Sequence, residues 1–259
     1  MLQKFDIVRL SPEAARAIEM RTIGLLGGMS WESTAVYYRR INQSVRDRLG
    51  GLHSAQVIMH SVDFDSIVEL QKADAWDQAG AVLARLARNL ETAGADCVLI
   101  CTNTMHKLAD TVQRAVSIPL LHITDVTGQA VVAAGSRRPL LLATRYTMEQ
   151  DFYLSQLRDQ HGLSPLVPDA EDRTAVHDII FNELCCGVVR EHSRRRYLDI
   201  IASAKAAGAD SVILGCTEIG LLIGPQHLDL PAFDSTLLHA DAAVAFALER
   251  HDEPERSAA

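Results

Sequence analysis

A ten-residue segment that occurs twice constrains the fold of this chain more than any other feature of its sequence. Residues 93–102 (AGADCVLICT) align without gaps on residues 207–216 (AGADSVILGC), 114 positions later. In both copies a glycine precedes a short apolar run, which is typical of a helix that ends and leads into a buried strand. The repeat is either a common connection between a helix and a strand, or the mark of two similar α/β lobes that face each other.

Short apolar runs alternate with segments of helical periodicity along the rest of the chain. Val82, Leu83, Leu86 and Leu90, for example, mark one face of a helix that Gly94 would end. This alternation predicts parallel sheets with right-handed crossovers. The predicted strands are 22–26, 56–62, 97–101, 139–143 and 211–215, Pro119 introduces a further apolar run at 120–123, and the later helices are 147–157, 193–207 and 235–250.

We therefore expect an α/β protein of two pseudo-symmetric, Rossmann-like lobes with parallel sheets. The site should lie in the cleft between them, because ligands of such sheets bind beyond the carboxyl ends of the strands. The expected divisions are an N-terminal extension (1–20), a first lobe (21–135) and a second lobe (136–234), with helix 235–250 folding back onto the first lobe.

The charge balance narrows the possible partners. The chain has 25 Lys and Arg against 33 Asp and Glu, a net charge of −8 and a pI of about 5.7, which argues against nucleic acid or an anionic membrane as a partner. No apolar run approaches the roughly 20 residues of a membrane helix. Charged residues are spread over residues 1–20, unlike a secretory signal. We expect a cytoplasmic protein with a small-molecule ligand.

The sequence also gives no sign of a metal or a cofactor. The five cysteines are an odd number without a CxxC pair, which argues against a disulfide framework and a zinc cluster. The histidines show no metal-ligand spacing, and no lysine stands out as a Schiff-base former. The glycine-rich segment 24–28 lacks the order of a dinucleotide-binding motif. We expect neither a metal nor a cofactor.

Cys216 is the strongest candidate for a reactive side chain. It directly follows a predicted strand and precedes a helical segment, where backbone N–H groups and the positive end of a helix dipole can stabilise a thiolate. The repeat equates Cys216 with Thr102, and Gly215 with Cys101. Two facing lobes would thus place Thr102 and Cys216 on opposite sides of one cleft, while Cys101 is the alternative if the register differs by one residue.

Small polar side chains follow several predicted strands. Ser30 follows the first strand, Asn103 and Thr104 follow the third, and Thr144 and Thr147 follow the first strand of the second half. Hydroxyl, amide and backbone donors of this kind suit the recognition of a carboxylate without a bulky cationic clamp.

These elements together resemble the aspartate/glutamate racemases, a family of cofactor-independent amino-acid racemases. The likeness covers about residues 21–250 and is carried by GLLGGMS (24–30), CTNT (101–104) and LGCTE (214–218). The stretches GGLHSAQ (50–56) and TRYTME (144–149) resemble the broad-specificity or L-aspartate/glutamate branch of that family.

The resemblance implies two α/β lobes, often a homodimer, no pyridoxal phosphate, and a two-base mechanism in which one side chain removes the Cα proton and another returns a proton from the opposite face. It carries Cys216 over as the second-lobe base. Most members have cysteine directly before the asparagine, whereas Thr102 stands there in this chain, as in the L-specific branch. The residues then expected to bind the substrate are Met29, Ser30, His53, Ser54, Gln56, Asn103, Thr104, Thr144, Thr147, Thr217 and Glu218.

The leading hypothesis is a racemase of aspartate or glutamate in which the Cys216 thiolate takes the proton from the L-enantiomer. Two alternatives stay open from the sequence. One is a cis/trans isomerase or decarboxylase of a dicarboxylic acid from the same superfamily, and the other is a protein that binds an acidic amino acid without chemistry.

Overall fold

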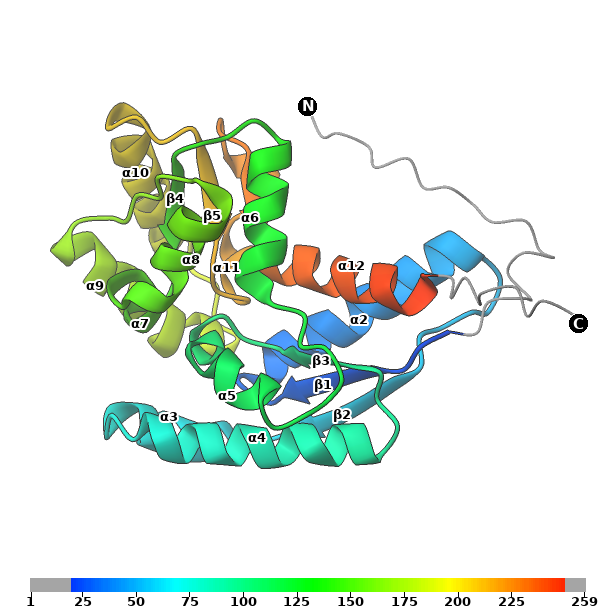
Figure 1. Cartoon of the computed structure of the whole chain (residues 1–259). Coiled ribbons are helices and arrows are strands. Elements are labelled where there is room, and N and C mark those ends of the chain that lie inside the picture. Colours follow the sequence, from blue (N-terminus) through cyan, green and yellow to red (C-terminus); the bar gives the residue numbers. More distant parts are fainter. Residues whose placement is uncertain (1–19, 250–259) are drawn as a thin grey trace, which may run out of the picture.

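The computed structural model describes residues 20–249 and contains two parallel three-stranded sheets. The predicted extension, apart from Met20, and the expected helix end at Arg250 lie outside the described residues. The first sheet has the order β2-β1-β3 and the second the order β4-β5-β6 (Figure 1). These sheets confirm the predicted α/β class with two lobes. The strands are β1 (Ile23–Gly27), β2 (Val57–Ser61), β3 (Cys97–Ile100), β4 (Pro139–Leu142), β5 (Ser211–Leu214) and β6 (Ala232–Asp234).

Helices pack against both sheets. The helices of the first half are α2 (Trp31–Leu49), α3 (Phe64–Lys72), α4 (Trp76–Thr92), α5 (Ala109–Gln113) and α6 (Ile123–Ala133), with a 3-10 turn, η1, at Thr104–Leu108. Those of the second half are α7 (Arg145–Glu149), α8 (Asp151–His161), α9 (Ala170–Asn182), α10 (Glu191–Ala206), α11 (Ile219–Leu222) and α12 (Ser235–Leu248), with 3-10 turns η2 (Leu184–Cys186) and η3 (Pro225–His227).

The repeated sequence has the same structural role in both lobes. Asp96 Oδ2 accepts the N–H of Thr22, which precedes β1, at 2.6 Å. Asp210 Oδ2 accepts the N–H groups of Arg137 and Arg138, which precede β4, at 2.7 and 3.0 Å. Each aspartate therefore fastens the start of the neighbouring strand, which explains why the segment recurs and favours two similar lobes over a chance connection.

The likeness of the lobes extends to the next strand along the sheet. In the second lobe Val212 of β5 pairs with Ala232 of β6, whereas in the first lobe Val98 of β3 forms an isolated bridge with Leu120. The apolar run at 120–123 does not continue as a longer strand, because α6 begins at Ile123. It is a reduced counterpart of β6.

The local signals of the sequence are confirmed in one helix and wrong in another. Gly94 follows the end of α4 with a φ of 98°, a conformation that glycine adopts easily. The helix expected at 147–157 is divided into α7 and α8, because Gln150 between them is extended (φ −93°, ψ 145°).

The last helix packs against the first lobe. Ala243 and Val244 of α12 are fully buried in one cluster with Tyr37 and Ile41 of α2 and Leu25 of β1. In Figure 1, α12 (red) lies beside α2 (blue). The helix therefore packs on α2 and β1, while the predicted domain division stays a prediction.

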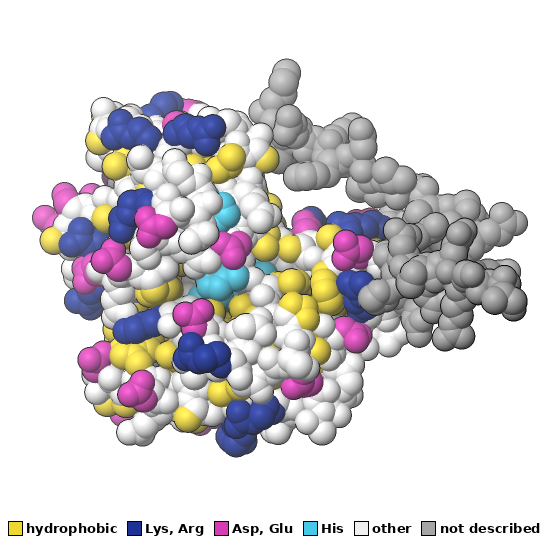
Figure 2. Space-filling view, viewed as in Figure 1, with side chains coloured by type: hydrophobic (Ala, Val, Ile, Leu, Met, Phe, Trp, Pro, Cys, Tyr) yellow, Lys and Arg dark blue, Asp and Glu magenta, His cyan; other side chains and the backbone are white. Residues whose placement is uncertain are grey.

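The outer surface carries charges of both signs. Figure 2 shows Lys and Arg interspersed with Asp and Glu on this face, and histidine side chains in the hollow where the lobes meet. Among residues 20–249, no helix is both long enough and apolar enough to cross a bilayer.

Candidate active site

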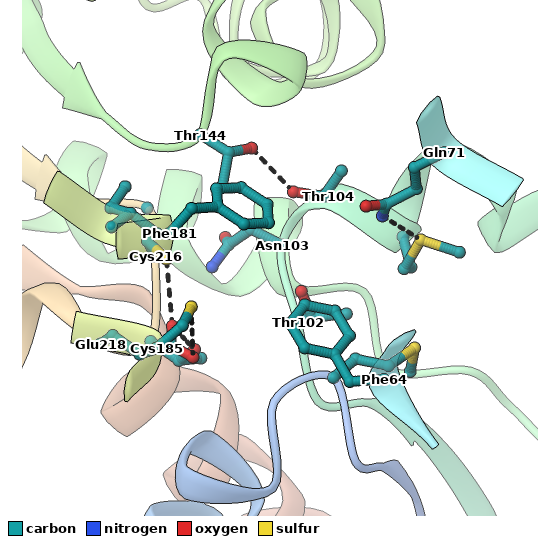
Figure 3. A pocket seen from close by; sticks show the side chains of 15 residues that line it. Phe64, Gln71, Thr102, Asn103, Thr104, Thr144, Phe181, Cys185, Cys216 and Glu218 are labelled. Atoms are coloured by element: carbon teal, nitrogen blue, oxygen red, sulfur yellow. Dashed lines mark hydrogen bonds between the residues drawn. The ribbon is translucent and has the colours of Figure 1, made fainter. Parts of the chain in front are cut away.

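Thr102 and Cys216 line one pocket between the lobes. Thr102 follows β3 and Cys216 follows β5, so both lie at the carboxyl ends of the strands that contain the repeated segment. Figure 3 shows them in this pocket together with Asn103 and Thr104 from the first lobe and Thr144 from the second. The full lining is Met29, Phe64, Gln71, Thr102, Asn103, Thr104, Met105, Thr144, Ile180, Phe181, Cys185, Gly215, Cys216, Thr217 and Glu218.

Cys101, the alternative to Thr102, lies on the other side of the strand. It is fully buried in the core cluster that includes Tyr37 and Val244, and it does not line the pocket. Burial without a compensating partner raises the pKa of its thiol. The register inferred from the repeat therefore agrees with the placement of the side chains, since Cys101 corresponds to Gly215 and Thr102 to Cys216.

The carboxylate of Glu218 is the centre of a buried network that joins the two lobes. Cys216 donates its S–H to Oε2 at 3.1 Å, and the Thr217 hydroxyl donates to the same oxygen at 2.5 Å. From the first lobe, Ser30 and Ser33 donate to Oε1 at 2.7 and 2.6 Å. Glu218 is only 3% exposed. Its negative charge is therefore stabilised by neutral donors from both lobes.

A second thiol contacts the same carboxylate. Cys185, in η2, donates its S–H to Glu218 Oε1 at 3.7 Å and lines the pocket. Two thiols thus flank one acid (Figure 3).

The expected stabilisation of a Cys216 thiolate is not found in this state of the site. Burial and the nearby charge of Glu218 raise the thiol pKa well above its ordinary value. The helix that follows, α11, has only four residues and supplies little dipole to oppose these effects. Cys216 is therefore a neutral thiol at rest, hydrogen-bonded to the group that can accept its proton.

Three threonine hydroxyls lie together between the lobes. Thr104 is 2.9 Å from Thr144 and 3.1 Å from Thr147, and the latter two are 3.3 Å apart, measured between hydroxyl oxygens. Because hydroxyl groups rotate, such a cluster can direct several donors toward one anion.

Asn103 supplies an acceptor next to these donors. Its amide nitrogen donates to the Ser235 hydroxyl at 3.0 Å, and that hydroxyl donates to Leu214 O at 2.9 Å. Its Oδ1 is buried and has no hydrogen-bond partner in the described part of the chain. A buried acceptor without a partner is costly, and a donor on a ligand would remove that cost.

The remaining wall of the pocket is mostly apolar. Phe64 from the first lobe and Phe181 from the second both line it, and the Gln71 amide donates to the Met105 sulfur at 3.0 Å. None of the described residues that line the pocket is Lys or Arg. Gln71 is therefore the polar side chain of this wall.

Some of the residues expected to bind substrate do not reach the pocket. His53, Ser54 and Gln56 precede β2 and are exposed. Because β1 and β2 are parallel, these residues lie at the amino-terminal edge of the sheet, opposite to the edge with Thr102. They do not line this pocket, so the prediction that they read the substrate side chain has no support from its geometry and stays a prediction.

The other predicted residues lie in or directly behind the pocket. Met29, Asn103, Thr104, Thr144, Thr217 and Glu218 line it. Ser30 and Thr147 are buried behind that lining, where Ser30 bonds Glu218 and Thr147 bonds the other threonines. The Ser30 side chain bonds Glu218, while the role expected for its backbone N–H as a donor to the substrate stays a prediction.

Sequence reasoning missed Ser33, Gln71, Phe64, Phe181 and the pocket position of Cys185. Ser33 had a local signal, since a serine one turn from the helix cap Ser30 shares its side of the helix. The others lie on helices or turns whose distance from the strand ends depends on tertiary packing. Within residues 20–249, no three His, Cys, Asp or Glu side chains are grouped so as to hold a metal ion.

Comparisons with known proteins agree with this architecture. The model of the Asp/Glu/hydantoin racemase family matches residues 26–243. A crystal structure of a candidate Asp/Glu racemase from Yersinia pestis is 48% identical with a TM-score of 0.83, and the match covers 89% of this chain and 100% of that one. An aspartate racemase homologue from Pyrococcus horikoshii is 32% identical with a TM-score of 0.78 and the same coverage.

A curated relative extends the match to a protein of broad specificity. The broad specificity amino-acid racemase RacX of Bacillus subtilis is 22% identical over 163 residues, 61% of this chain and 68% of that protein. The family match covers both strand-end residues and most of the two lobes. The chain belongs to the Asp/Glu/hydantoin racemase family.

Proposed function

We propose that this protein racemises aspartate or glutamate without a cofactor and prefers the L-enantiomer. The observation that carries the proposal is that Thr102 and Cys216, from equivalent strand ends of two lobes, line one pocket. Two groups on opposite walls suit a reaction in which a proton leaves one face of Cα and returns to the other.

The Cys216–Glu218 contact supports the first half of this reaction. Glu218 takes the thiol proton, and the Cys216 thiolate removes the Cα proton of the L-amino acid. The substrate ammonium group brings a positive charge into the pocket, which lowers the thiol pKa that burial and Glu218 have raised.

Thr102 completes the reaction from the opposite wall. Its hydroxyl protonates the other face of the carbanion, which gives the D-enantiomer. The proton on Glu218 then leaves through water, and a proton from water restores the Thr102 hydroxyl. Because a threonine alkoxide is a rare species near neutral pH, this half of the reaction is the slower one.

The polar groups of the pocket suit the common part of an amino acid. The hydroxyls of Thr104 and Thr144, with Thr147 behind them, would bind the α-carboxylate. Asn103 Oδ1, which has no partner in residues 20–249, would accept from the ammonium group. The substrate side chain would then extend toward Gln71, whose amide can donate to a carboxylate.

Two further predictions concern the assembly and the cell. We expect a homodimer, to be tested by sedimentation at micromolar concentration, and a cytoplasmic location, to be tested by fractionation. Neither is needed for the chemistry proposed for a single chain.

The direct test is proton exchange in heavy water. L-aspartate and L-glutamate are incubated with the protein in D2O, loss of the Cα proton is followed by NMR, and inversion is followed by chiral chromatography. Asparagine and glutamine serve as matched substrates that keep the size but lose the side-chain charge. Deuterium at Cα with an intact carbon skeleton is the expected result.

Other results would assign other functions. Loss of carbon dioxide would identify a decarboxylase, and binding without any exchange would identify a binding protein. Exchange of the two amides at rates equal to those of the acids would contradict the preference for a dicarboxylate.

A further inference from the structure

His106 lies behind the turn that carries Thr102 and is hydrogen-bonded through both ring nitrogens. Its Nε2 accepts the backbone N–H of Ile123 at 3.2 Å, and its Nδ1 lies 2.8 Å from the backbone oxygen of Thr102. A nitrogen that accepts an N–H carries no proton, so the proton of the neutral ring is on Nδ1. His106 therefore donates to the Thr102 carbonyl.

This bond holds one end of the Thr102 residue, and a second bond holds the other. The Thr102 N–H donates to Ile100 O at 2.8 Å, which closes a tight turn directly after β3. The side chain between these two bonds lines the pocket (Figure 3). These two bonds restrain both peptide groups of Thr102 and so fix its backbone relative to the pocket.

The surroundings of His106 keep it neutral. The ring is 3% exposed, and burial is the main cause that lowers its pKa well below the ordinary value. Two more imidazoles pack edge-on against it, with centroid distances of 4.7 Å to His122 and 5.6 Å to His239. A proton on Nε2 would also face the N–H of Ile123, so the donor stays on Nδ1.

A second buried histidine, His239, holds the residues that precede α6. Its Nε2 donates to Leu121 O and its Nδ1 accepts from the Tyr37 hydroxyl, both at 2.8 Å. The segment 121–123 is thus held by two neutral histidines, one of which is also bonded to Thr102. This segment leads into α6 and provides a fixed support for the turn after β3.

We propose that His106 is a positioning residue for the first-lobe half of the site. Its Nδ1–H fixes the peptide of Thr102, so that the hydroxyl faces the substrate carbon, while its Nε2 anchors the ring to the start of α6. The inference rests on the proposed racemisation, because proton delivery from Thr102 is the step that His106 supports. Exchange at Cys216 does not depend on it.

Two conservative substitutions separate the two nitrogens of His106. In His106→Asn the amide occupies the place of Nδ1 and can still donate to Thr102. In His106→Gln the amide reaches the place of Nε2, keeps the link to Ile123 and loses the bond to Thr102. The two variants remove one hydrogen bond each, so a merely structural role would affect them alike.

The readout is inversion compared with exchange for the same L-substrate in D2O. We expect His106→Gln to lower the rate of inversion by about 10- to 100-fold while exchange without inversion changes little. His106→Asn should retain most of the inversion. His122→Asn is the matched control. It removes a ring next to His106 but leaves a side-chain acceptor that can cap α6 by accepting the Thr124 N–H. Among residues 20–249, His122 makes no bond to Thr102, so inversion should not depend on it.

Equal losses of inversion and exchange in both His106 variants would overturn the inference, and so would full inversion in folded His106→Gln. If the unaltered protein exchanged neither enantiomer, the proposed function would fail first.

A test that needs no variant is the ¹⁵N spectrum of the His106 ring in the unaltered protein. Protonated Nδ1 with bare Nε2 is expected, and the opposite tautomer would overturn the inference even if a variant failed to fold.

Discussion

Cys216 and Glu218 place a thiol and a carboxylate at 3.1 Å in a site from which most water is excluded. The carboxylate provides a proton acceptor, and its charge also raises the thiol pKa. In the proposed mechanism, the Cys216 thiolate therefore forms only when a cation, such as the ammonium group of an amino acid, enters the pocket and lowers the thiol pKa.

Replacing the sulfur tests its role as the base. Cys216→Ser keeps the shape of the side chain but has no comparable population of anion near neutral pH. We expect exchange in both enantiomers to fall by about 100- to 10,000-fold, with an unchanged circular dichroism spectrum. Cys186→Ser, at an exposed thiol outside the pocket lining, is the matched control. Activity near that of the unaltered protein would show that another group removes the proton.

Glu218→Gln separates charge from shape at the same place. Removal of the negative charge should lower the thiol pKa of Cys216, so alkylation by iodoacetamide should reach half its maximum rate at a lower pH than in the unaltered protein. Peptide mass spectrometry distinguishes Cys216 from Cys185. Exchange should fall at the same time, because the proton acceptor is lost. A midpoint at higher pH would contradict the electrostatic account.

The sequence predicts only part of this residue-level arrangement. Thr102, Cys216 and Glu218 could be found because the repeat and the motifs place them at strand ends. Gln71 and Cys185 could not, because they reach the pocket through the packing of helices and turns, for which short-range patterns contain no distance. The raised pKa of Cys216 depends on the same packing.

At the scale of elements, the strand-end register decides which side chain faces the pocket. Thr102→Cys places a thiol opposite Cys216, and we expect it to speed exchange of the D-enantiomer at least tenfold, because a thiol ionises far more readily than a hydroxyl. Cys101→Ala should alter exchange by less than about twofold, since this side chain is buried on the other side of β3. NMR in D2O measures both.

The outcome can separate the two positions clearly. Loss of all exchange in Cys101→Ala, in a protein with an unchanged melting temperature, would mean that Cys101 is the partner base. The strands β3 and β5 themselves were predictable, since each is a short apolar run after a helix end. The extended Gln150 between α7 and α8 was not, because no glycine or proline marks that break.

At the scale of the molecule, buried neutral histidines link stability to pH. Burial lowers the pKa of His239 to about 3, against about 6.5 in an unfolded chain. The stabilisation is therefore present above pH 6.5 and is lost as the pH falls toward 3, because the unfolded chain binds the proton first. In His239→Gln, the unfolding free energy should therefore decrease less steeply as the pH falls. The difference in slope should be up to about 1.4 kcal/mol per pH unit in this window.

Urea denaturation at several pH values between 7.5 and 4 measures this slope. The comparison at pH 7.5, where the ring is neutral in both folded and unfolded chains, separates the pH effect from any constant cost of losing the Tyr37 bond. Identical slopes for the two proteins would show that His239 does not carry the linkage.

The network around Glu218 joins residues that are 185 and 188 positions apart in the chain. Contacts of such sequence separation form late, because a long loop must close before they stabilise anything. The order of events during refolding should reflect this distance. Helical circular dichroism should recover before exchange activity does, and the delay should be seen even at concentrations too low for association. A newly made chain would thus hold its folded lobes for a time before it became a catalyst.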